Sequence, residues 1–295
     1  MRYWVLAALA AALGNAAFAG GVVATVKPLH SLVAAVMDGD VQGPVLLVGG
    51  RVSPHTFQLA PSQMSAAQGA DVVFAIGGGL EPFLPRLKAT FTDPTQLVVM
   101  ADQPGMFVLP MREGAFDDAD AAVEDVPPDP HLWMDPQNAV TMVDVIVKTL
   151  GDVYPQQAVL YQQNGEALKA RIKVLDGDIR SRMQPLAARR FIVFHDALHY
   201  FEHAYGLRAA DAIALAGEPL PGAQHLSHLR ALLESGKAVC VLREPESGRL
   251  PGQLAEGTPA RLGLMDPEAT QLDPGPKLYP DLLSATADQL EKCLK

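Results

Sequence analysis

The chain has 295 residues, of which 49% are hydrophobic, and its 23 basic and 33 acidic side chains give a formal net charge of −10. This length allows about two domains of ordinary size with a substantial core, and the acidic balance argues against nucleic acid or an anionic membrane surface as a partner. The 25 glycines and 24 prolines are spread along the chain, which excludes a collagen-like repeat and wholesale disorder.

Residues 1–19 have the features of a secretory signal peptide. Arg2 provides the positive start, an apolar run extends from Trp4 to Leu13, and Ala17-Phe18-Ala19 places small residues at the cleavage positions. The apolar run is too short to span a bilayer as a permanent helix. We therefore predict an exported protein, cleaved after Ala19.

In residues 20–154, short apolar runs alternate with segments that have a helical pattern. Residues 61–68 are one of these predicted helices. Glycines follow the second and third apolar runs, as expected where strands end. Strands that alternate with helices indicate βαβ units and a mainly parallel sheet, so we predict an N-terminal α/β lobe here. Its predicted strands are 22–26, 45–48, 72–76 and 97–100.

Residues 155–184 are predicted to form one long helix. Pro155 is a favourable first helical residue, Pro185 ends the pattern, and apolar residues recur between them at steps of three and four. A helix of about 28 residues would be about 42 Å long, more than one small domain needs, so we expect it to join two lobes. The strand pattern restarts at 191–194, 209–214, 238–242 and 263–265. These predict a second α/β lobe over 185–295, with a cleft between the lobes.

Cys240 and Cys293 are the two cysteines of the chain. Because exported proteins meet an oxidising compartment, an even pair predicts one disulfide. The alternative is two buried free thiols. Neither cysteine has another cysteine or a histidine nearby at zinc-site spacing, which argues against a metal-binding role.

Residues 113–129 hold seven acidic side chains and no basic one. Such a segment is typical of a solvated, mobile surface loop. The alternative interpretation is a loop that weakly collects cations and takes no part in the primary site.

Four residues that commonly bind metals stand near predicted strand or helix ends. His55 follows the second predicted strand, His131 precedes a new helix, and His195 and Asp266 each follow a strand of the second lobe. In open parallel sheets, ligands bind beyond the carboxyl ends of the strands, so these side chains could meet in the cleft. Three imidazoles and one carboxylate suit zinc, which accepts four nitrogen or oxygen ligands.

The sequence resembles the zinc-binding components of bacterial ABC importers, the ZnuA-like proteins in metal-specific cluster A-I of solute-binding proteins. The resemblance covers essentially the whole chain after residue 19. It rests on motifs in the expected order, namely Lys27-Pro28-Leu29-His30-Ser31, Ser53-Pro54-His55-Thr56-Phe57, Pro130-His131-Leu132-Trp133-Met134-Asp135-Pro136, Phe194-His195-Asp196-Ala197, Pro221-Gly222-Ala223-Gln224, Glu244-Pro245, Leu264-Met265-Asp266-Pro267 and the Cys293-Leu294 ending.

The resemblance implies two α/β lobes held by a rigid long helix, with His55, His131 and His195 at the family's three metal positions and Asp266 at its acidic fourth position. Manganese-type relatives commonly carry glutamate where this chain has His195, which favours zinc. The implied function is capture of Zn²⁺ in the periplasm by a monomeric, non-catalytic protein. The implied partner is an ABC permease with a cytoplasmic ATPase.

Some residues depart from the family pattern or leave alternatives open. Zinc importers often insert a His-rich loop before the second metal histidine, whereas residues 113–129 are short and acidic. His199 and His203 follow His195 at steps of four, which predicts one helical face if the helix starts at Asp196. They are expected at the surface or in contact with the metal ligands, and the alternative is that His199 itself touches the metal. A manganese or iron carrier or a metal-dependent adhesin of the same fold is the alternative function. A zinc hydrolase is disfavoured because the sequence from His195 to His199 lacks the glutamate of His-Glu-x-x-His.

Overall fold

A computed structural model of the chain describes residues 21–40, 42–112, 126–214 and 221–295. The predicted signal peptide and most of the acidic segment therefore lie outside the described residues. Two separate four-stranded sheets form the centre of the molecule, and every strand pair in them is parallel. The predicted α/β class with two parallel sheets is confirmed.

The first sheet has the order β2-β1-β3-β4 and the second the order β6-β5-β7-β8. The strands of the first sheet are β1 (Val22–Ala24), β2 (Val45–Leu46), β3 (Val72–Ala75) and β4 (Leu97–Val99). Those of the second are β5 (Arg190–His195), β6 (Arg208–Ala214), β7 (Cys240–Arg243) and β8 (Arg261–Leu264). All eight coincide with predicted strands to within a few residues.

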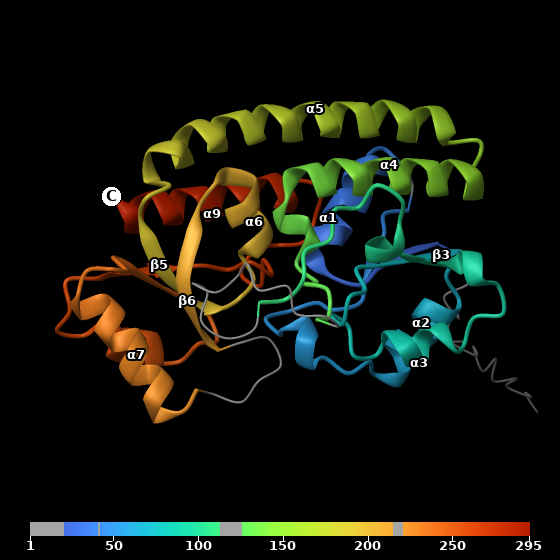
Figure 1. Cartoon of the computed structure of the whole chain (residues 1–295). Coiled ribbons are helices and arrows are strands. Elements are labelled where there is room, and N and C mark those ends of the chain that lie inside the picture. Colours follow the sequence, from blue (N-terminus) through green and yellow to red (C-terminus); the bar gives the residue numbers. More distant parts are fainter. Residues whose placement is uncertain (1–20, 41, 113–125, 215–220) are drawn as a thin grey trace, which may run out of the picture.

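Helices cover both sheets (Figure 1). They are α1 (Lys27–Val36), α2 (Pro61–Gln68), α3 (Leu84–Lys88), α4 (Pro136–Val153), α5 (Ala158–Met183), α6 (His199–Tyr205), α7 (Ala223–Glu234), α8 (Leu250–Ala255) and α9 (Leu278–Leu294). Short 3₁₀ turns occur at Pro54–Thr56, Pro94–Gln96, Met100–Asp102, Leu132–Met134 and Gln184–Leu186. None of the helices in the described ranges has the length and apolar character needed to cross a membrane.

Helix α5 is the long helix that the sequence predicts. Its 26 residues span about 39 Å, and it packs on α1 and α4 at one end and on α6 and α9 at the other (Figure 1). It begins three residues later than predicted because the chain first turns after α4, where the Gln157 amide donates to the Tyr154 carbonyl. Gly165 allows the close approach of α4, since a Cβ there would lie 2.4 Å from a Val147 methyl.

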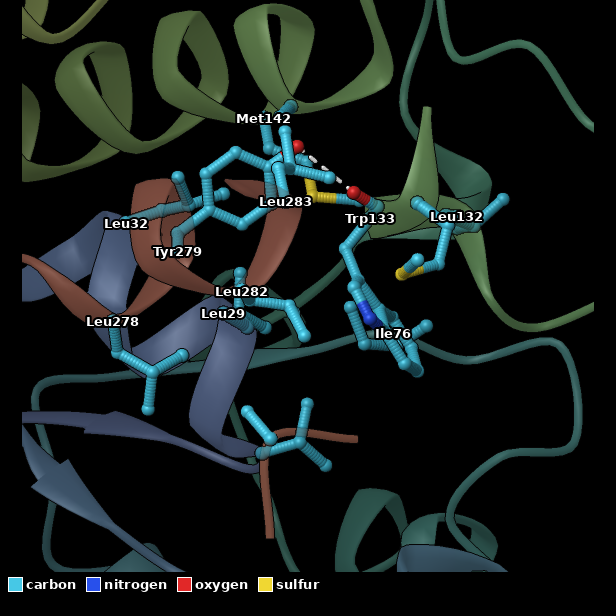
Figure 2. Close-up of a cluster of buried hydrophobic side chains, with 14 of the residues drawn as sticks. Leu29, Leu32, Ile76, Leu132, Trp133, Met142, Leu278, Tyr279, Leu282 and Leu283 are labelled. Atoms are coloured by element: carbon cyan, nitrogen blue, oxygen red, sulfur yellow. Dashed lines mark hydrogen bonds between the residues drawn. The ribbon is translucent and has the colours of Figure 1, made fainter. Parts of the chain in front are cut away.

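Helix α9 provides a second connection between the two halves, which the sequence did not reveal. In Figure 2 its residues Leu278, Tyr279, Leu282 and Leu283 pack toward α1 and Trp133, which belong to the first half. The Tyr279 hydroxyl donates to the Trp133 carbonyl at 2.8 Å. The apolar core is therefore continuous from one sheet to the other and fixes their relative placement.

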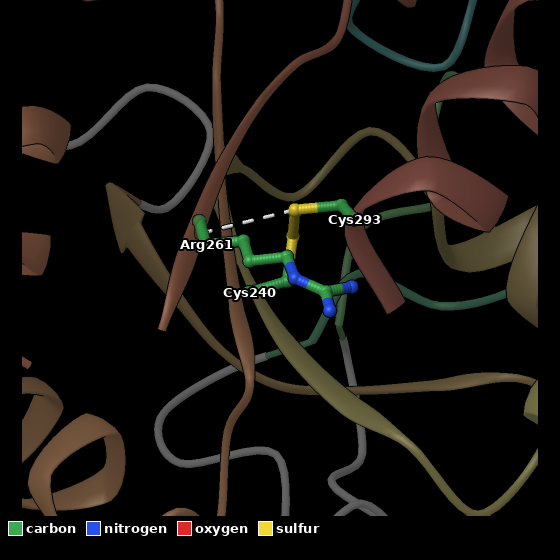
Figure 3. The surroundings of a disulfide bond; sticks show 3 residues. All are labelled: Cys240, Arg261 and Cys293. Atoms are coloured by element: carbon green, nitrogen blue, oxygen red, sulfur yellow. Dashed lines mark hydrogen bonds between the residues drawn. A yellow bond between two sulfur atoms is a disulfide. The ribbon is translucent and has the colours of Figure 1, made fainter. Parts of the chain in front are cut away.

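Cys240 and Cys293 form a disulfide, as predicted. It ties the last turn of α9 to β7, with a Cα–Cα distance of 5.7 Å across 53 residues of sequence (Figure 3). The sulfur of Cys293 lies 3.8 Å from the Arg261 carbonyl oxygen, at the start of the neighbouring strand β8. The bond therefore fixes the C-terminal helix against the second sheet.

Candidate metal centre

Three imidazoles converge between the two sheets. The Nε2 atom of His131 lies 3.1 Å from Nε2 of His55 and 3.3 Å from Nε2 of His195. Within the part of the chain that the structure describes, this is the one group of three ligand-type residues whose ligand atoms all lie within 4.8 Å of one another. The structure therefore brings together the three histidines proposed from the sequence.

Local structure explains how each imidazole reaches this point. His55 lies in the 3₁₀ turn that starts after Ser53, whose hydroxyl accepts the His55 backbone N–H. His131 directly precedes the turn Leu132–Met134, and His195 is the last residue of β5. His195 follows the rule that ligands bind at the carboxyl ends of parallel strands, whereas His55 and His131 come from the connections of the first half.

The His131 ring is held by Asp129. Its Nδ1–H donates to Asp129 Oδ1 at 2.8 Å, and the His131 backbone N–H donates to the same oxygen at 2.9 Å. Although burial alone raises the pKa of Asp129, the charge and hydrogen bonds of His131 hold that pKa well below its usual range. Because the carboxylate accepts the Nδ1 proton, the lone pair of Nε2 faces the other two imidazoles.

The His195 ring is held in the same way by Glu244. Its Nδ1–H donates to Glu244 Oε1 at 2.6 Å. Burial alone lowers the pKa of His195, but the charge and hydrogen bond of Glu244 outweigh burial and raise the pKa to about 9. A metal that binds Nε2 at neutral pH must therefore displace a proton from this ring.

His55 has a carboxylate on its Nε2 side. Glu268 Oε1 lies 3.6 Å from His55 Nε2 and accepts a hydrogen bond from the Ser53 hydroxyl at 2.9 Å. Burial, together with the nearby charges of His131 and His195, lowers the pKa of His55 to about 3. The ring is thus neutral at physiological pH and has a lone pair for a metal. Burial, and repulsion from Glu244 among other acids, raise the pKa of Glu268 to about 7.

Asp266 is not among the three residues whose ligand atoms converge. Its Oδ1 accepts from the backbone N–H and the hydroxyl of Thr270, and its Oδ2 accepts from the Gln271 backbone N–H. Both oxygens therefore close a turn directly after β8. Glu268, two residues further along the chain, is the acid that lies 3.6 Å from His55 Nε2.

His199 and His203 are not members of the three-histidine group. Helix α6 begins at His199 and not at Asp196, so His199 and His203 lie in the helix whereas His195 ends β5. His199 Nδ1 lies 3.5 Å from Asp129 Oδ2, next to the carboxylate that holds His131. The His203 ring packs on Phe107 with centroids 4.8 Å apart.

Three carboxylates of the site had no assigned role in the sequence. Asp129 belongs to the acidic segment, and its position two residues before His131 is the sequence signal for a partner. Glu244 stands out in the sequence only as part of a Glu-Pro motif. Glu268 offered no signal beyond its closeness to Asp266.

Comparison with known proteins identifies the family. A family model described as zinc-uptake complex component A, periplasmic, matches residues 22–293. The chain belongs to this family. The high-affinity zinc uptake system protein ZnuA of Brucella abortus is 35% identical over 306 residues, covering 93% of this chain and 91% of the relative.

Solved structures agree with the sequence match. A crystal structure of ZnuA superposes with a TM-score of 0.78 at 26% identity, covering 94% of this chain and 100% of that one. A crystal structure of a ZnuA deletion mutant with zinc bound gives the same TM-score and identity, covering 94% and 98%. This chain therefore shares the two-lobed fold of ZnuA proteins.

Proposed function

We propose that the protein captures Zn²⁺ in the periplasm and delivers it to an ABC importer. The observation that carries the proposal is the convergence of His55, His131 and His195 between two lobes, in a chain whose family is named for zinc uptake. Two of the rings have Nδ1 bound to a carboxylate, so that Nε2 is available to the ion. Metal-binding histidines are commonly oriented in this way.

The donor set favours zinc over manganese. Imidazole nitrogen suits zinc and other borderline ions, whereas manganese prefers carboxylate, carbonyl and water oxygens. Manganese or iron carriage and adhesion are therefore not favoured as alternatives, and the family match points the same way.

The role that we propose is delivery and not hydrolysis. A zinc hydrolase needs an open coordination position and a general base near the bound water. In this proposal, a monomer with lobes at 20–154 and 185–295 and the long helix at 155–184 between them releases its ion to a membrane permease with a cytoplasmic ATPase. Export depends on the predicted signal peptide.

Competition against a chromophoric chelator tests the zinc site. Loss of the hydrogen-bond partner of a metal ligand typically weakens metal binding by about 10–100-fold. Loss of a ligand itself should cost more, so we expect a larger decrease in zinc affinity for each of His55→Ala, His131→Ala and His195→Ala. His228→Ala is the matched control, because His228 is about half exposed on α7. A histidine whose replacement keeps wild-type affinity is not a ligand.

Growth in chelated medium tests delivery. A strain lacking the gene should recover when zinc is added, and the wild-type gene should restore growth where the His131→Ala gene does not. Recovery with manganese but not with zinc would contradict the proposed cargo.

A further inference from the structure

Glu268 lies beside His55 at the three-histidine group, although no motif points to it. Its side chain is 96% buried, and its Oε2 atom has no hydrogen-bond partner among the described residues. A buried carboxylate oxygen without a partner is costly, so its position calls for a cation. The Oε1 atom already lies 3.6 Å from His55 Nε2. Two ligands of a tetrahedral zinc ion with bonds of about 2.0 Å lie about 3.3 Å apart, close to this spacing.

The backbone on either side of Glu268 is held by residues from the first half of the chain. The Lys27 ammonium, at the start of α1, donates to three carbonyls of this turn, those of Ala269, Thr270 and Leu272, at 2.9–3.1 Å. These three bonds use every hydrogen that a lysine ammonium can donate. The Trp133 indole N–H donates to the Pro267 carbonyl at 2.9 Å.

The conformation of this turn is one that the chain does not adopt readily. Ala269, directly after Glu268, has a φ of 55°, in the left-handed region that favours glycine. An alanine persists there only when surrounding contacts impose the conformation. The bonds from Lys27 and Trp133, together with the Asp266 contacts to Thr270, are those contacts.

We propose that Glu268 is the fourth ligand of the zinc ion, and that Lys27 is the residue that positions it. This inference rests on the proposed zinc function. Three imidazoles and this carboxylate complete a four-coordinate shell with donors from both halves of the chain. In this proposal Asp266 does not bind the ion. Its hydrogen bonds close the turn that places Glu268 next to His55.

Glu268→Ala and Glu268→Gln test the ligand. Each should weaken zinc binding by about tenfold or more. Each should also change the visible absorption of the Co²⁺-loaded protein, because a water replaces the carboxylate. Glu256→Gln is the control for loss of a carboxylate, since Glu256 is exposed at the end of α8. It should leave the cobalt spectrum unchanged. Wild-type affinity or an unchanged spectrum in Glu268→Ala would overturn the inference.

The same assay separates this inference from the proposed function. If wild-type protein binds zinc tightly and His131→Ala loses it while Glu268→Ala does not, the fourth ligand is wrong and the function stands. If wild-type protein itself fails to bind zinc tightly, the proposed function fails.

A double-mutant cycle tests the role of Lys27. Lys27→Met should weaken zinc binding and change the cobalt spectrum in the wild-type background, yet should cause no further loss when Glu268 is already alanine. Equal losses in both backgrounds would show that Lys27 does not act through Glu268. If Lys27→Met does not fold, Trp133→Phe removes the bond to Pro267 and is put through the same cycle.

Discussion

Replacing Arg112 with methionine should strongly destabilise the protein. The Arg112 guanidinium links the segment before the acidic loop to the second half of the chain, where it donates to both oxygens of Asp196 and of Glu202. All three side chains are at least 92% buried. Methionine keeps the packing of the apolar stem and leaves two buried carboxylates without their cation.

The magnitude follows from that burial. Removing one partner of a buried ion pair costs about 3–5 kcal/mol, because the remaining charge is uncompensated. The whole free energy of unfolding is about 5–15 kcal/mol, so the Arg112→Met protein should still fold at low temperature. Lys148→Met is the control, since Lys148 and Asp152 form an ion pair that is mostly exposed, and its loss should not be measurable.

The pH dependence makes the test sharper. Burial alone raises the pKa of Glu202, but the charge and hydrogen bonds of Arg112 lower it overall. Its stabilising contribution is therefore complete above the unfolded pKa of about 4.3 and is lost as the pH falls. Without Arg112, burial raises the pKa of Glu202, and stability is instead lost as the pH rises. The difference between wild type and Arg112→Met should thus grow from pH 4 to pH 7.

Urea unfolding of metal-free protein in the presence of a chelator measures this difference without a contribution from zinc binding. A loss below about 1 kcal/mol at pH 7, as for an exposed ion pair, would refute the reasoning. So would a loss that is the same at pH 4 and pH 7.

Three further predictions concern the frame around the site. Gly165→Ala should destabilise by about 1–3 kcal/mol through overpacking against α4, whereas Gly177→Ala, with open space around it, should stabilise by about 0.5–1 kcal/mol in thermal unfolding. Similar effects at both glycines would contradict the close packing. Replacing Cys240 and Cys293 with serine should cost about 4 kcal/mol on the chain-entropy model and leave zinc affinity unchanged. Deleting residues 114–125, which lie outside the described residues, should leave the tight-site dissociation constant nearly unchanged in a competition assay. A tenfold loss there would mean that a ligand lies in the deleted segment.

Local patterns predicted most of the fold because they depend on residues close together in sequence. The short apolar runs that begin at Val72 and Leu97 predict strands, one of them fully and one partly buried. The uninterrupted apolar stripe before Met183 predicts one long helix. The histidines could be placed because parallel strands end at a common edge. His195, as the last residue of β5, shows this most directly.

Contacts between distant segments could not be predicted in this way. The packing of α9 on α1 joins residues about 250 positions apart, and nothing in the periodicity of either helix names the other as its partner. The role of Asp266 cannot be read from local sequence for a related reason. A carboxylate after a strand can bind a metal or close a turn, and the hydrogen-bond donors of Thr270 and Gln271 decide between the two.

The carboxylates around the three imidazoles differ in the nitrogen that each faces. Asp129 and Glu244 lie on the Nδ1 side of their histidines, so they fix the ring and leave Nε2 for the ion. Glu268 lies on the Nε2 side of His55, where the ion itself would be. A carboxylate that accepts from Nδ1 orients the imidazole and makes it a stronger ligand. A carboxylate on the Nε2 side can itself bind the ion. The sequence shows only acids near histidines, and the side of the ring on which each acid lies is what separates orientation from coordination.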